Sequence, residues 1–549
     1  MVQDLKWDID TREFYLVGGG IASLTSAVFL IRDGHIAGDH IHILEESNVT
    51  GGSMDGSGDA EHGYVIRGGR MFDEEAYTCL FGIMDTIPSL HDQKLTIKDE
   101  FYSFNQQIKT SGKARLIDKN LNKIDVSMLG FDRTHRLAML DIMLLPEEVL
   151  GTKRIDECFP PSFFSTTFWF MWATTFAFQP WHSAVEFKRY LHRFLHELPR
   201  ISDLSGVRRT PFNQYDSIIL PITKWLEAHG VHFDFHCTVT ALDFAPENEK
   251  QTVIAIHGTR DNQPFVTPIR SQDVVFVTIG SMTSGASLGT MNSAPAVLDK
   301  EADGAWALWE NIAKKSLNFG NPSIFDQRIP ESLWESFTIT LYDRALLDKI
   351  IAFSNNQPGT GALLTCKDSS WLMSIVVPYQ PHFINQPRDV QVFWGYALFP
   401  DNVGDFVKKK MTDCTGKEIL QELCGQLGFL DEFDQMCENA KCIPCIMPFI
   451  TSQFLTRAKG DRPKVVPDSS TNLAFLGQFS EIPDDVVFTV DYSVRSAQTA
   501  VYTLLAINKP ITPIYQGQYD VRVLINTLKT LLKDDNLQME LELVKRMIG

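Results

Sequence analysis

The chain has 549 residues, of which 44% are hydrophobic, 11% aromatic and 21% charged. This length predicts more than one domain with a large core, and the plentiful Leu, Ile, Val and Phe exclude a disordered chain. The formal net charge of −18 excludes the basic surface of a nucleic-acid-binding protein, so we expect no nucleic-acid partner.

The N-terminal residues, MVQDLKWDIDTREF, contain no basic stretch followed by an apolar core, which predicts that there is no secretory signal. The nine cysteines are scattered and odd in number, which favours reduced thiols over a disulfide framework. Together these features predict a cytoplasmic protein. The lone CxxC at 442–445 has no second pair and no nearby His ligands. We interpret its cysteines as buried small residues and expect no metal site.

The first predicted element is a buried parallel strand at 14–17 (FYLV), followed at once by a glycine-rich turn and a helix with apolar spacing. The turn fits the pattern GxGxxG, with Ser23 in the last position. Gly18 allows the tight turn, and Gly20 lets the backbone approach a pyrophosphate at the helix N-terminus. Ser23 is small enough for the helix to pack closely on the strand. The pattern predicts a dinucleotide-binding unit.

A second predicted strand at 41–44 (IHIL) ends at Glu45, whose carboxylate can accept hydrogen bonds from a ribose. Gly51 and Gly52 follow shortly afterwards. This spacing of an acid and a glycine pair resembles the extended FAD fingerprint of the glutathione-reductase-like flavoproteins. The alternative is a glycine-rich turn in an ordinary α/β domain.

Two later apolar strands, at 273–280 (DVVFVTIG) and 473–477 (LAFLG), each end in glycine. The first is expected where the chain crosses back under the flavin. The second precedes a helix whose N-terminus would approach the flavin ring and ribityl chain. The FAD domain would therefore be discontinuous, with substrate-facing insertions between its parts.

An uncharged, aromatic-rich segment spans 163–181 (FFSTTFWFMWATTFAFQPW). It approaches the roughly 20 residues of a membrane span, but its polar residues and central aromatics favour a buried segment that lines an apolar pocket. A second aromatic group lies within 371–396. These surfaces either suit a long apolar ligand or fill a domain core, and composition leaves both open. The amphipathic segment from 519 onward either packs on the body or lies on a membrane surface.

Several longer motifs carry a family resemblance. They are GGGIASL, GGSMDG, RGGRMF, TTFAFQPWHSAVEFKRYLHRFLH, NQYDS, QPHF and CTGKEIL. From about residue 12 to about residue 515 the chain resembles the fatty-acid hydratases, also known as the oleate hydratase or myosin-cross-reactive-antigen family. The resemblance implies FAD binding without net redox chemistry and addition of water to the cis double bond of oleate or a similar long-chain acid. It also implies peripheral membrane contact, and either a homodimer or a monomer.

The resemblance also implies roles for individual residues. Tyr190, in EFKRYLHRF, matches the family's proposed proton donor; alkene hydration needs such a donor at one carbon and a water aimed at the other. Gln214 and His382 would hold the substrate carboxylate, His382 as a cation. Val376 and Pro378 stand where the family usually has Thr and Asn, which predicts a thinner or rearranged carboxylate anchor.

The glycine-rich loop at 67–71 departs most from the family. The usual pattern is RGGRE, whose Glu is thought to activate the attacking water, but this chain has Met71. Three interpretations stay open. A nearby carboxylate takes over, with Glu74 as the catalytic candidate beside Asp73 and Glu75; the flavin or a backbone carbonyl positions the water; or hydratase activity is lost. The same acidic run also fits the first turn of a helix, the interpretation that we favour.

We therefore predict an α/β fold: a glutathione-reductase-type, Rossmann-like FAD-binding domain with an inserted α+β substrate domain and a C-terminal helical tail. The expected bounds are 1–75, 200–290 and 465–515 for the FAD domain, 76–199 and 291–464 for the substrate domain, and 516–549 for the tail. The expected cofactor-binding residues are Gly18, Gly20, Ile21, Ala22, Ser23, Glu45, Glu46, Gly52, Ser53, Arg67, Gly68, Gly69, Arg70, Met71, Gly280, Ser281, Gly477 and Phe488.

The predicted function is a fatty-acid hydratase, and two rivals stay open. A flavin redox enzyme acting on a lipid would need a hydride or electron partner, and the sequence contains no second nucleotide fingerprint. A FAD-containing fatty-acid-binding protein without hydratase activity is favoured by Met71. No GxSxG, HExxH or P-loop motif and no metal-ligand cluster occurs in the sequence, so we expect neither nucleophilic nor metal catalysis.

Overall fold

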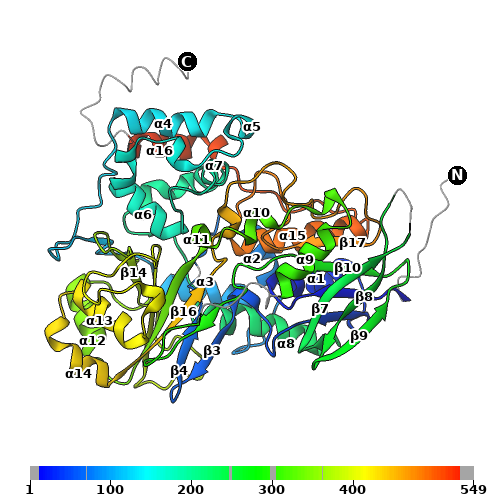
Figure 1. The fold of residues 1–549 in the computed structure, drawn as a ribbon, viewed down its shortest axis with the longest axis horizontal. Helices are drawn as coiled ribbons and strands as arrows, with labels where there is room; N and C mark the ends of the chain where they lie inside the picture. Colours follow the sequence, from blue (N-terminus) through cyan, green and yellow to red (C-terminus); the bar gives the residue numbers. More distant parts are fainter. Residues whose placement is uncertain (1–10, 70, 247–249, 297–303, 362, 532–549) are drawn as a thin grey trace.

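The computed structural model describes residues 11–69, 71–246, 250–296, 304–361 and 363–531. These residues form a mixed α/β protein with a parallel sheet, a second, largely antiparallel sheet and a separate helical layer (Figure 1).

The parallel sheet has five strands in the order β17-β10-β1-β2-β6, and every neighbouring pair is parallel. Its strands are short apolar runs because both faces are covered. The strands predicted at 14–17 and 41–44 are confirmed, and those predicted at 273–280 and 473–477 are present with shorter bounds. The strands are β1 (Phe14–Val17), β2 (Ile41–Leu44), β6 (His232–Asp234), β10 (Val274–Thr278) and β17 (Leu473–Leu476).

Alternate residues of these strands reach opposite faces of the parallel sheet. Leu16 and Phe276 join the core that contains α1, α8 and α15, whereas Val17 and Val277 pack with the three-stranded sheet β7-β8-β9 and with α9. The covering elements are α1 (Ile21–Arg32), α8 (Leu220–Ala228), α15 (Val490–Leu504), β7 (Cys237–Phe244), β8 (Val253–Arg260), β9 (Gln263–Pro268) and α9 (Gly304–Ala313).

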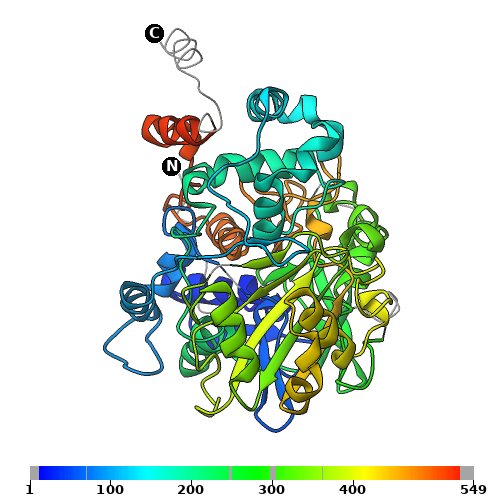
Figure 2. The same cartoon turned by 90° about the vertical axis from the view of Figure 1, so that its left-hand side faces the viewer.

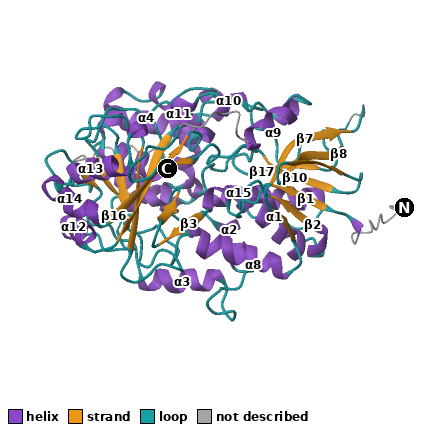
Figure 3. Ribbon diagram, turned by 60° about the horizontal axis from the view of Figure 1, so that its bottom comes forward, coloured by secondary structure: helices purple, strands orange, loops and turns teal. Residues whose placement is uncertain are grey.

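The second sheet has seven strands in the order β11-β16-β12-β15-β14-β13-β5. The β5 strand comes from the first predicted substrate segment and most of the others from the second, so the two segments share one sheet. Helices α12, α13 and α14 lie beside this sheet (Figure 3). The elements are β5 (Leu116–Ile117), β11 (Ser287–Leu288), β12 (Trp334–Leu341), β13 (Leu364–Cys366), β14 (Met373–Val376), β15 (Gln391–Ala397), β16 (Ala440–Met447), α12 (Ala345–Ser354), α13 (Gly416–Gln426) and α14 (Phe433–Glu438).

The CxxC motif lies within β16. Cys442 and Cys445 are buried, and neither forms a disulfide. Burial raises the pKa of the Cys445 thiol to about 12, so this thiol is not reactive at neutral pH. The interpretation of the CxxC cysteines as buried small residues is confirmed.

A two-stranded hairpin, β3 (Gly56–Asp59) and β4 (Gly63–Ile66), joins the seven-stranded sheet through side chains of β12. The backbone N–H groups of Tyr64 and Ile66 donate to Thr340 Oγ1 and Thr338 Oγ1 at 2.9 and 3.1 Å. The hairpin therefore fixes the start of the glycine-rich loop that begins at residue 67.

The helical layer contains the aromatic segment at 163–181, whose Phe168 and Trp172 are fully buried. No helix in the described part of the chain is long and apolar enough to cross a membrane. The tail helix α16 packs on this layer, where Thr527 Oγ1 donates to Leu195 O at 3.2 Å (Figure 2). The rest of the predicted tail, 532–549, lies outside the described residues. The elements of this layer are α4 (Arg133–Leu144), α5 (Glu147–Leu150), α6 (Thr167–Phe176), α7 (Ala184–Arg193), the 3-10 helix η6 (Leu195–Arg200) and α16 (Val521–Leu531).

Four further α-helices occur in the described part of the chain. They are α2 (Thr78–Met84), α3 (Ile97–Gln107), α10 (Ser323–Asp326) and α11 (Ile329–Ser332).

Candidate functional site

The predicted dinucleotide turn lines a cavity at the carboxyl ends of β1, β2 and β10, which we call the glycine cavity. It brings together most of the residues predicted to bind the cofactor. Of that set it is lined by Gly18, Gly20, Ile21, Ala22, Glu45, Glu46, Gly52, Ser53, Gly280, Ser281 and Gly477.

The backbone of the turn leaves an open cradle. Gly18 donates its N–H to Leu44 O at 2.8 Å, and its φ of 94° turns the chain sharply out of β1. Gly51 N donates to Gly19 O at 2.9 Å, so the second glycine pair lies against the first. A Cβ built on Gly20 would meet nothing closer than Gly52 Cα at 3.9 Å. The start of α1 therefore faces free space, an arrangement that suits a phosphate group.

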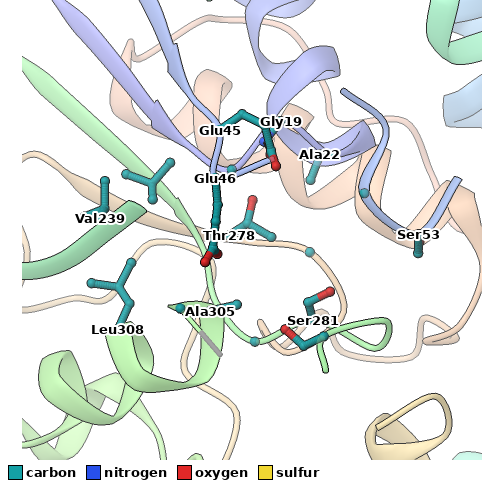
Figure 4. Close-up of a pocket in the computed structure, with 18 of the residues that line it drawn as sticks. Gly19, Ala22, Glu45, Glu46, Ser53, Val239, Thr278, Ser281, Ala305 and Leu308 are labelled. Carbon is teal, nitrogen blue, oxygen red and sulfur yellow. The ribbon is translucent and has the colours of Figure 1, made fainter. Parts of the chain in front are cut away.

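Two neighbouring carboxylates border this cavity. Glu45 accepts hydrogen bonds from Gly19 N at 2.5 Å and from Ser47 N at 2.8 Å, which hold it at the end of β2. The Glu46 side chain extends to the start of α9, where a Cβ on Gly304 would lie 2.7 Å from Glu46 Oε2 (Figure 4). Such carboxylates can accept hydrogen bonds from sugar hydroxyls.

Some residues predicted to bind the cofactor lie outside the glycine cavity. Ser23 packs α1 against β10, with its Oγ 3.2 Å from Thr278 Oγ1. Arg67 donates to Asp55 Oδ1 at 2.9 Å and to Gly52 O at 2.7 Å, and so ties the glycine-rich loop to the glycine cavity. Arg70 lies outside the described residues. Gly68, Gly69, Met71 and Phe488 line further cavities.

Three further cavities adjoin one another. The tyrosine cavity contains Met71 and Tyr190 in its lining, the middle cavity contains Trp334 and Tyr396, and the arginine cavity contains Arg209. Shared lining residues join them in a row. The tyrosine cavity and the middle cavity share Gly69, Met71, Thr175 and Phe488. The middle cavity and the arginine cavity share Gly69, Arg209, Val376 and Trp394.

Gly69 lines all three of these cavities. A Cβ at this position would lie 2.5 Å from Trp394 Cζ2. Only glycine therefore lets the loop pass so close to β15, and the loop forms one wall along the whole row.

Tyr190 lies on α7 at the apolar end of the row. Its ring packs against Phe176, Phe178 and Phe454, and its hydroxyl donates to Val487 O at 2.6 Å. Burial raises the pKa of this hydroxyl well above its usual value, so it stays protonated. The surrounding rings can stabilise a positive charge that develops beside it.

The predicted carboxylate-binding residues meet in the arginine cavity, which is lined by Gln214, Val376, Pro378 and His382. Gln214 Nε2 donates to Gly68 O at 2.9 Å, so this side chain also holds the glycine-rich loop. His382 Nε2 has no hydrogen-bond partner among the described residues.

The charge at this end differs from the prediction. Burial, reinforced by the nearby Arg209 charge, lowers the pKa of His382 to about 3, so His382 is neutral before any ligand binds. Burial lowers the pKa of Arg209 only to about 10, which leaves its guanidinium charged. The positive charge in this cavity therefore belongs to Arg209.

The acidic run at 73–75 was predicted to form the first turn of a helix. In the structure it lies before α2 and is not part of it. It forms a separate turn, in which Ala76 N donates to Asp73 Oδ1 at 2.7 Å. The backbone of Tyr77 (φ −105°, ψ 41°) separates this turn from α2. Glu74 pairs with Arg208 at 3.0 Å and lines none of the four cavities described here. Its catalytic role stays a prediction.

Gln478 connects the glycine cavity to the tyrosine cavity. It lines the glycine cavity, accepts a hydrogen bond from Phe488 N and donates to Thr489 O at 2.9 Å. Phe488 and Thr489 line the tyrosine cavity. Phe488 has a φ of 70°, an unfavourable backbone conformation for a bulky residue, and these contacts help to hold it there.

Comparison with known proteins places this geometry in a family, because the model of the MCRA family matches residues 11–502. The chain belongs to the MCRA family. It is 38% identical over 527 residues to the protein named oleate hydratase from Streptococcus pyogenes serotype M49 (strain NZ131), which covers 94% of this chain and 89% of that protein. It is 33% identical over 556 residues to linoleate hydratase from Lactiplantibacillus plantarum, with 94% and 97% covered. The family resemblance drawn from the motifs is confirmed.

Two cavity residues of this MCRA-family chain were missed by the sequence analysis. Arg209 stands just before the NQYDS motif, and Glu197 directly follows the HRFLH motif. Adjacency to a motif was the available signal. It could not separate Arg209 from Arg208, because only the folded structure places Arg209 in the cavities and pairs Arg208 with Glu74.

Proposed function

We propose that this chain is a FAD-dependent hydratase that adds water, without net redox chemistry, to the cis double bond of a long-chain unsaturated fatty acid, for example oleate to 10-hydroxystearate. The names of the two relatives support the reaction class. The observation that carries the proposal is the row of three cavities, aromatic at the Tyr190 end and cationic at the Arg209 end. A free fatty acid has the matching form, an apolar chain that ends in a carboxylate.

The glycine cavity fits FAD by its donor set. Backbone N–H groups at the start of α1 suit the pyrophosphate, and the carboxylates of Glu45 and Glu46 suit ribose hydroxyls. When bound, the flavin would supply a flat aromatic ring system. We propose the glutathione-reductase-type arrangement, with the FAD domain at 1–75, 200–290 and 465–515, the substrate domain at 76–199 and 291–464, and the tail at 516–549.

Arg209 is the proposed carboxylate anchor. Its Nε has no hydrogen-bond partner, and no acidic side chain pairs with it, among the described residues. A half-buried cation with an enclosed, unpartnered Nε is costly until an anion compensates it. Val376 and Pro378 offer no polar side-chain atoms, so Arg209, with His382 and Gln214, would carry the binding of the carboxylate.

Tyr190 is the proposed proton donor to one alkene carbon. The positive charge that develops would face the rings around Tyr190, and the apolar lining would exclude water other than the attacking molecule. That water bonds to the other carbon and must then lose a proton. Met71 lines the same cavity but has no basic atom to accept it.

We further propose a cytoplasmic protein with peripheral membrane contact, active as a homodimer or a monomer. No nucleic acid is expected as a partner, since the net charge is −18.

The deciding experiment incubates the FAD-loaded protein with oleate in heavy-oxygen water and analyses the products by mass spectrometry. We expect a hydroxylated acid that contains one labelled oxygen. Unchanged oleate, repeated with several cis-unsaturated acids and with both oxidised and reduced flavin, would overturn the proposal. Retained oleate binding in that case would favour a fatty-acid-binding protein, the alternative that Met71 supports.

A further inference from the structure

The tyrosine cavity contains two carboxylates that could take the role that Met71 cannot. Asp73 and Glu197 both line it, together with Leu204 and Val207. We propose that Glu197 accepts the proton of the attacking water, with Asp73 and His196 as its positioning residues. This inference deepens the proposed hydratase function and rests on it.

Glu197 is buried but incompletely satisfied. It lies on η6 with 7% of its surface exposed, and its Oε1 accepts a hydrogen bond from Arg200. Its Oε2 accepts no hydrogen bond from an N–H or hydroxyl donor among the described residues, and the Asp73 carboxyl lies within hydrogen-bonding reach of this side chain. A Cβ on Gly206 would lie only 2.0 Å from this oxygen, so glycine at that position leaves the space that the carboxylate occupies. A buried carboxylate oxygen that accepts no hydrogen bond suits a ligand water.

Asp73 supplies a fixed negative charge beside Glu197. Its Oδ2 lies 2.8 Å from His196 Nε2. Burial alone would raise the pKa of Asp73, but the hydrogen bond and charge of His196 hold it below its usual value. Asp73 is therefore ionised at neutral pH, and the pair it forms with His196 keeps it in place.

The groups around Glu197 have opposing effects on its pKa. Burial raises it and the Asp73 charge adds to this, whereas Arg200 and His196 lower it; the result is a pKa of about 7. Glu75 also faces this cluster, 3.9 Å from His196, and the Tyr515 ring packs on His196. A proton acceptor with a pKa near the working pH is well suited to general base catalysis.

The complete reaction balances with these groups. The π electrons of the alkene take the Tyr190 hydroxyl proton and form a C–H bond, which leaves a phenolate and a cationic carbon. The water oxygen bonds to that carbon, and the proton it loses goes to the Glu197 carboxylate. Return of this proton to the Tyr190 phenolate restores both residues. The sum is alkene plus water giving alcohol.

The pH dependence of turnover tests the assignment. In the wild type we expect kcat to rise with pH through a pKa near 7, because Glu197 must be ionised to accept a proton. Glu197→Gln should lower kcat by about 100-fold or more and remove this limb, with oleate binding retained. Asp73→Asn should move the limb to lower pH, because the neighbouring negative charge is lost. Glu227→Gln, on α8 and 44% exposed, is the matched control and should change neither.

The inference would be overturned if Glu197→Gln turned over as fast as the wild type and kept the same pH limb. So would a loss of turnover that follows Glu74→Gln instead. A second measurement does not depend on activity: infrared spectroscopy should detect a protonated carboxyl that titrates near neutral pH in the wild type and is absent from Glu197→Gln. A Glu197 carboxyl that stays protonated throughout the neutral range would overturn the inference even if the protein hydrates no acid. Absence of turnover in the wild type with that band present would instead count against the proposed hydratase function.

Discussion

Arg208 and Arg209 are adjacent in the chain but lie in different surroundings. Arg208 is 27% exposed and pairs with Glu74 at 3.0 Å. Arg209 lines both the middle cavity and the arginine cavity, and it has no acidic partner in the described part of the chain. This difference makes the two residues a natural test and control for recognition of a carboxylate.

We expect Arg209→Met to raise the KM for oleate by about 10- to 100-fold, because a charge-assisted hydrogen bond contributes about 1.5–3 kcal/mol. The methyl ester of oleate, which lacks the charge, should be affected much less. Steady-state kinetics with both substrates measures this, with Arg208→Met as the control. An unchanged KM for oleate in Arg209→Met would remove Arg209 from the binding site.

Tyr190→Phe deletes only the hydroxyl that donates to Val487 O. We expect kcat to fall by about 100- to 10,000-fold with little change in oleate affinity, because the ring still fills the cavity but no longer donates a proton. Single-turnover rates together with oleate titration measure both quantities. Tyr502→Phe on α15, whose hydroxyl donates to Asp33 outside the cavities, should keep full activity. Near wild-type turnover in Tyr190→Phe would contradict its role as donor.

At the scale of elements, buried ion pairs fix the segment that joins β17 to α15. Asp485 pairs with Arg193 of α7 at 2.9 Å and with Arg495 of α15 at 2.8 Å, and all three side chains are almost fully buried. These contacts link the helical layer to the parallel sheet. They also fix the stretch that carries Val487 and Phe488 beside the tyrosine cavity.

Asp485→Asn should lower the free energy of unfolding by about 3–5 kcal/mol, because it leaves two buried guanidinium groups without their full counter-charge. Denaturant unfolding measures this. The adjacent Asp484 is exposed, so Asp484→Asn should change stability by no more than about 0.5 kcal/mol. Equal stability of the two variants would show that the network contributes little.

A second buried carboxyl, Glu335, lies near the start of β12 with no hydrogen-bond partner for either oxygen among the described residues. Burial raises its pKa well above the usual value, so the folded protein keeps this group protonated. Its contribution to stability is therefore fully present below the pKa of the unfolded chain, about 4.3. It is lost as pH rises toward the folded pKa.

Glu335→Gln removes this titration. The stability of the variant relative to wild type should therefore increase with pH, by about 1.4 kcal/mol per unit across the window between the two pKa values. Denaturant unfolding from about pH 5 to about pH 8 measures the trend. Glu438→Gln, exposed at the end of α14, should show no trend. A constant difference between Glu335→Gln and wild type would mean that Glu335 is ionised in the folded state.

At the scale of the whole molecule, the helical layer carries several exposed apolar side chains. Leu137 and Leu144 of α4 are 53% and 77% exposed, and Val521 of α16 is 64% exposed. The same layer supplies Tyr190 to the tyrosine cavity. A membrane contact on this layer would place the proposed cavity close to fatty acids in the lipid.

Leu144→Glu should weaken co-sedimentation with phosphatidylcholine vesicles by about tenfold or more, because burial of a leucine contributes about 1.5–3 kcal/mol. Leu317→Glu is the matched control, since Leu317 is 99% exposed but lies outside the helical layer. Equal vesicle binding by the two variants would exclude this surface as the contact.

The parallel sheet and its glycine turn were predictable because they depend on short runs of adjacent residues, such as 14–23. The row of cavities was not, because it depends on contacts between distant segments. Gly69 is needed at its position because Trp394 packs on it. Glu197 fits beside the tyrosine cavity because Gly206 has no side chain in the space that its carboxylate occupies. The charge expected on His382 differed for the same reason: burial, which the sequence does not contain, lowers its pKa to about 3.

The position of Gln478 has a thermodynamic consequence for the two proposed ligands. Its side chain lines the glycine cavity and also holds the backbone of Phe488 and Thr489 beside the tyrosine cavity. A nucleotide that shifts Gln478 therefore changes the free energy of binding at the second site. Such coupling is reciprocal: the factor by which FAD changes the affinity for oleate equals the factor by which oleate changes the affinity for FAD. A flavin that exchanges no electrons could thus still control when the substrate is held.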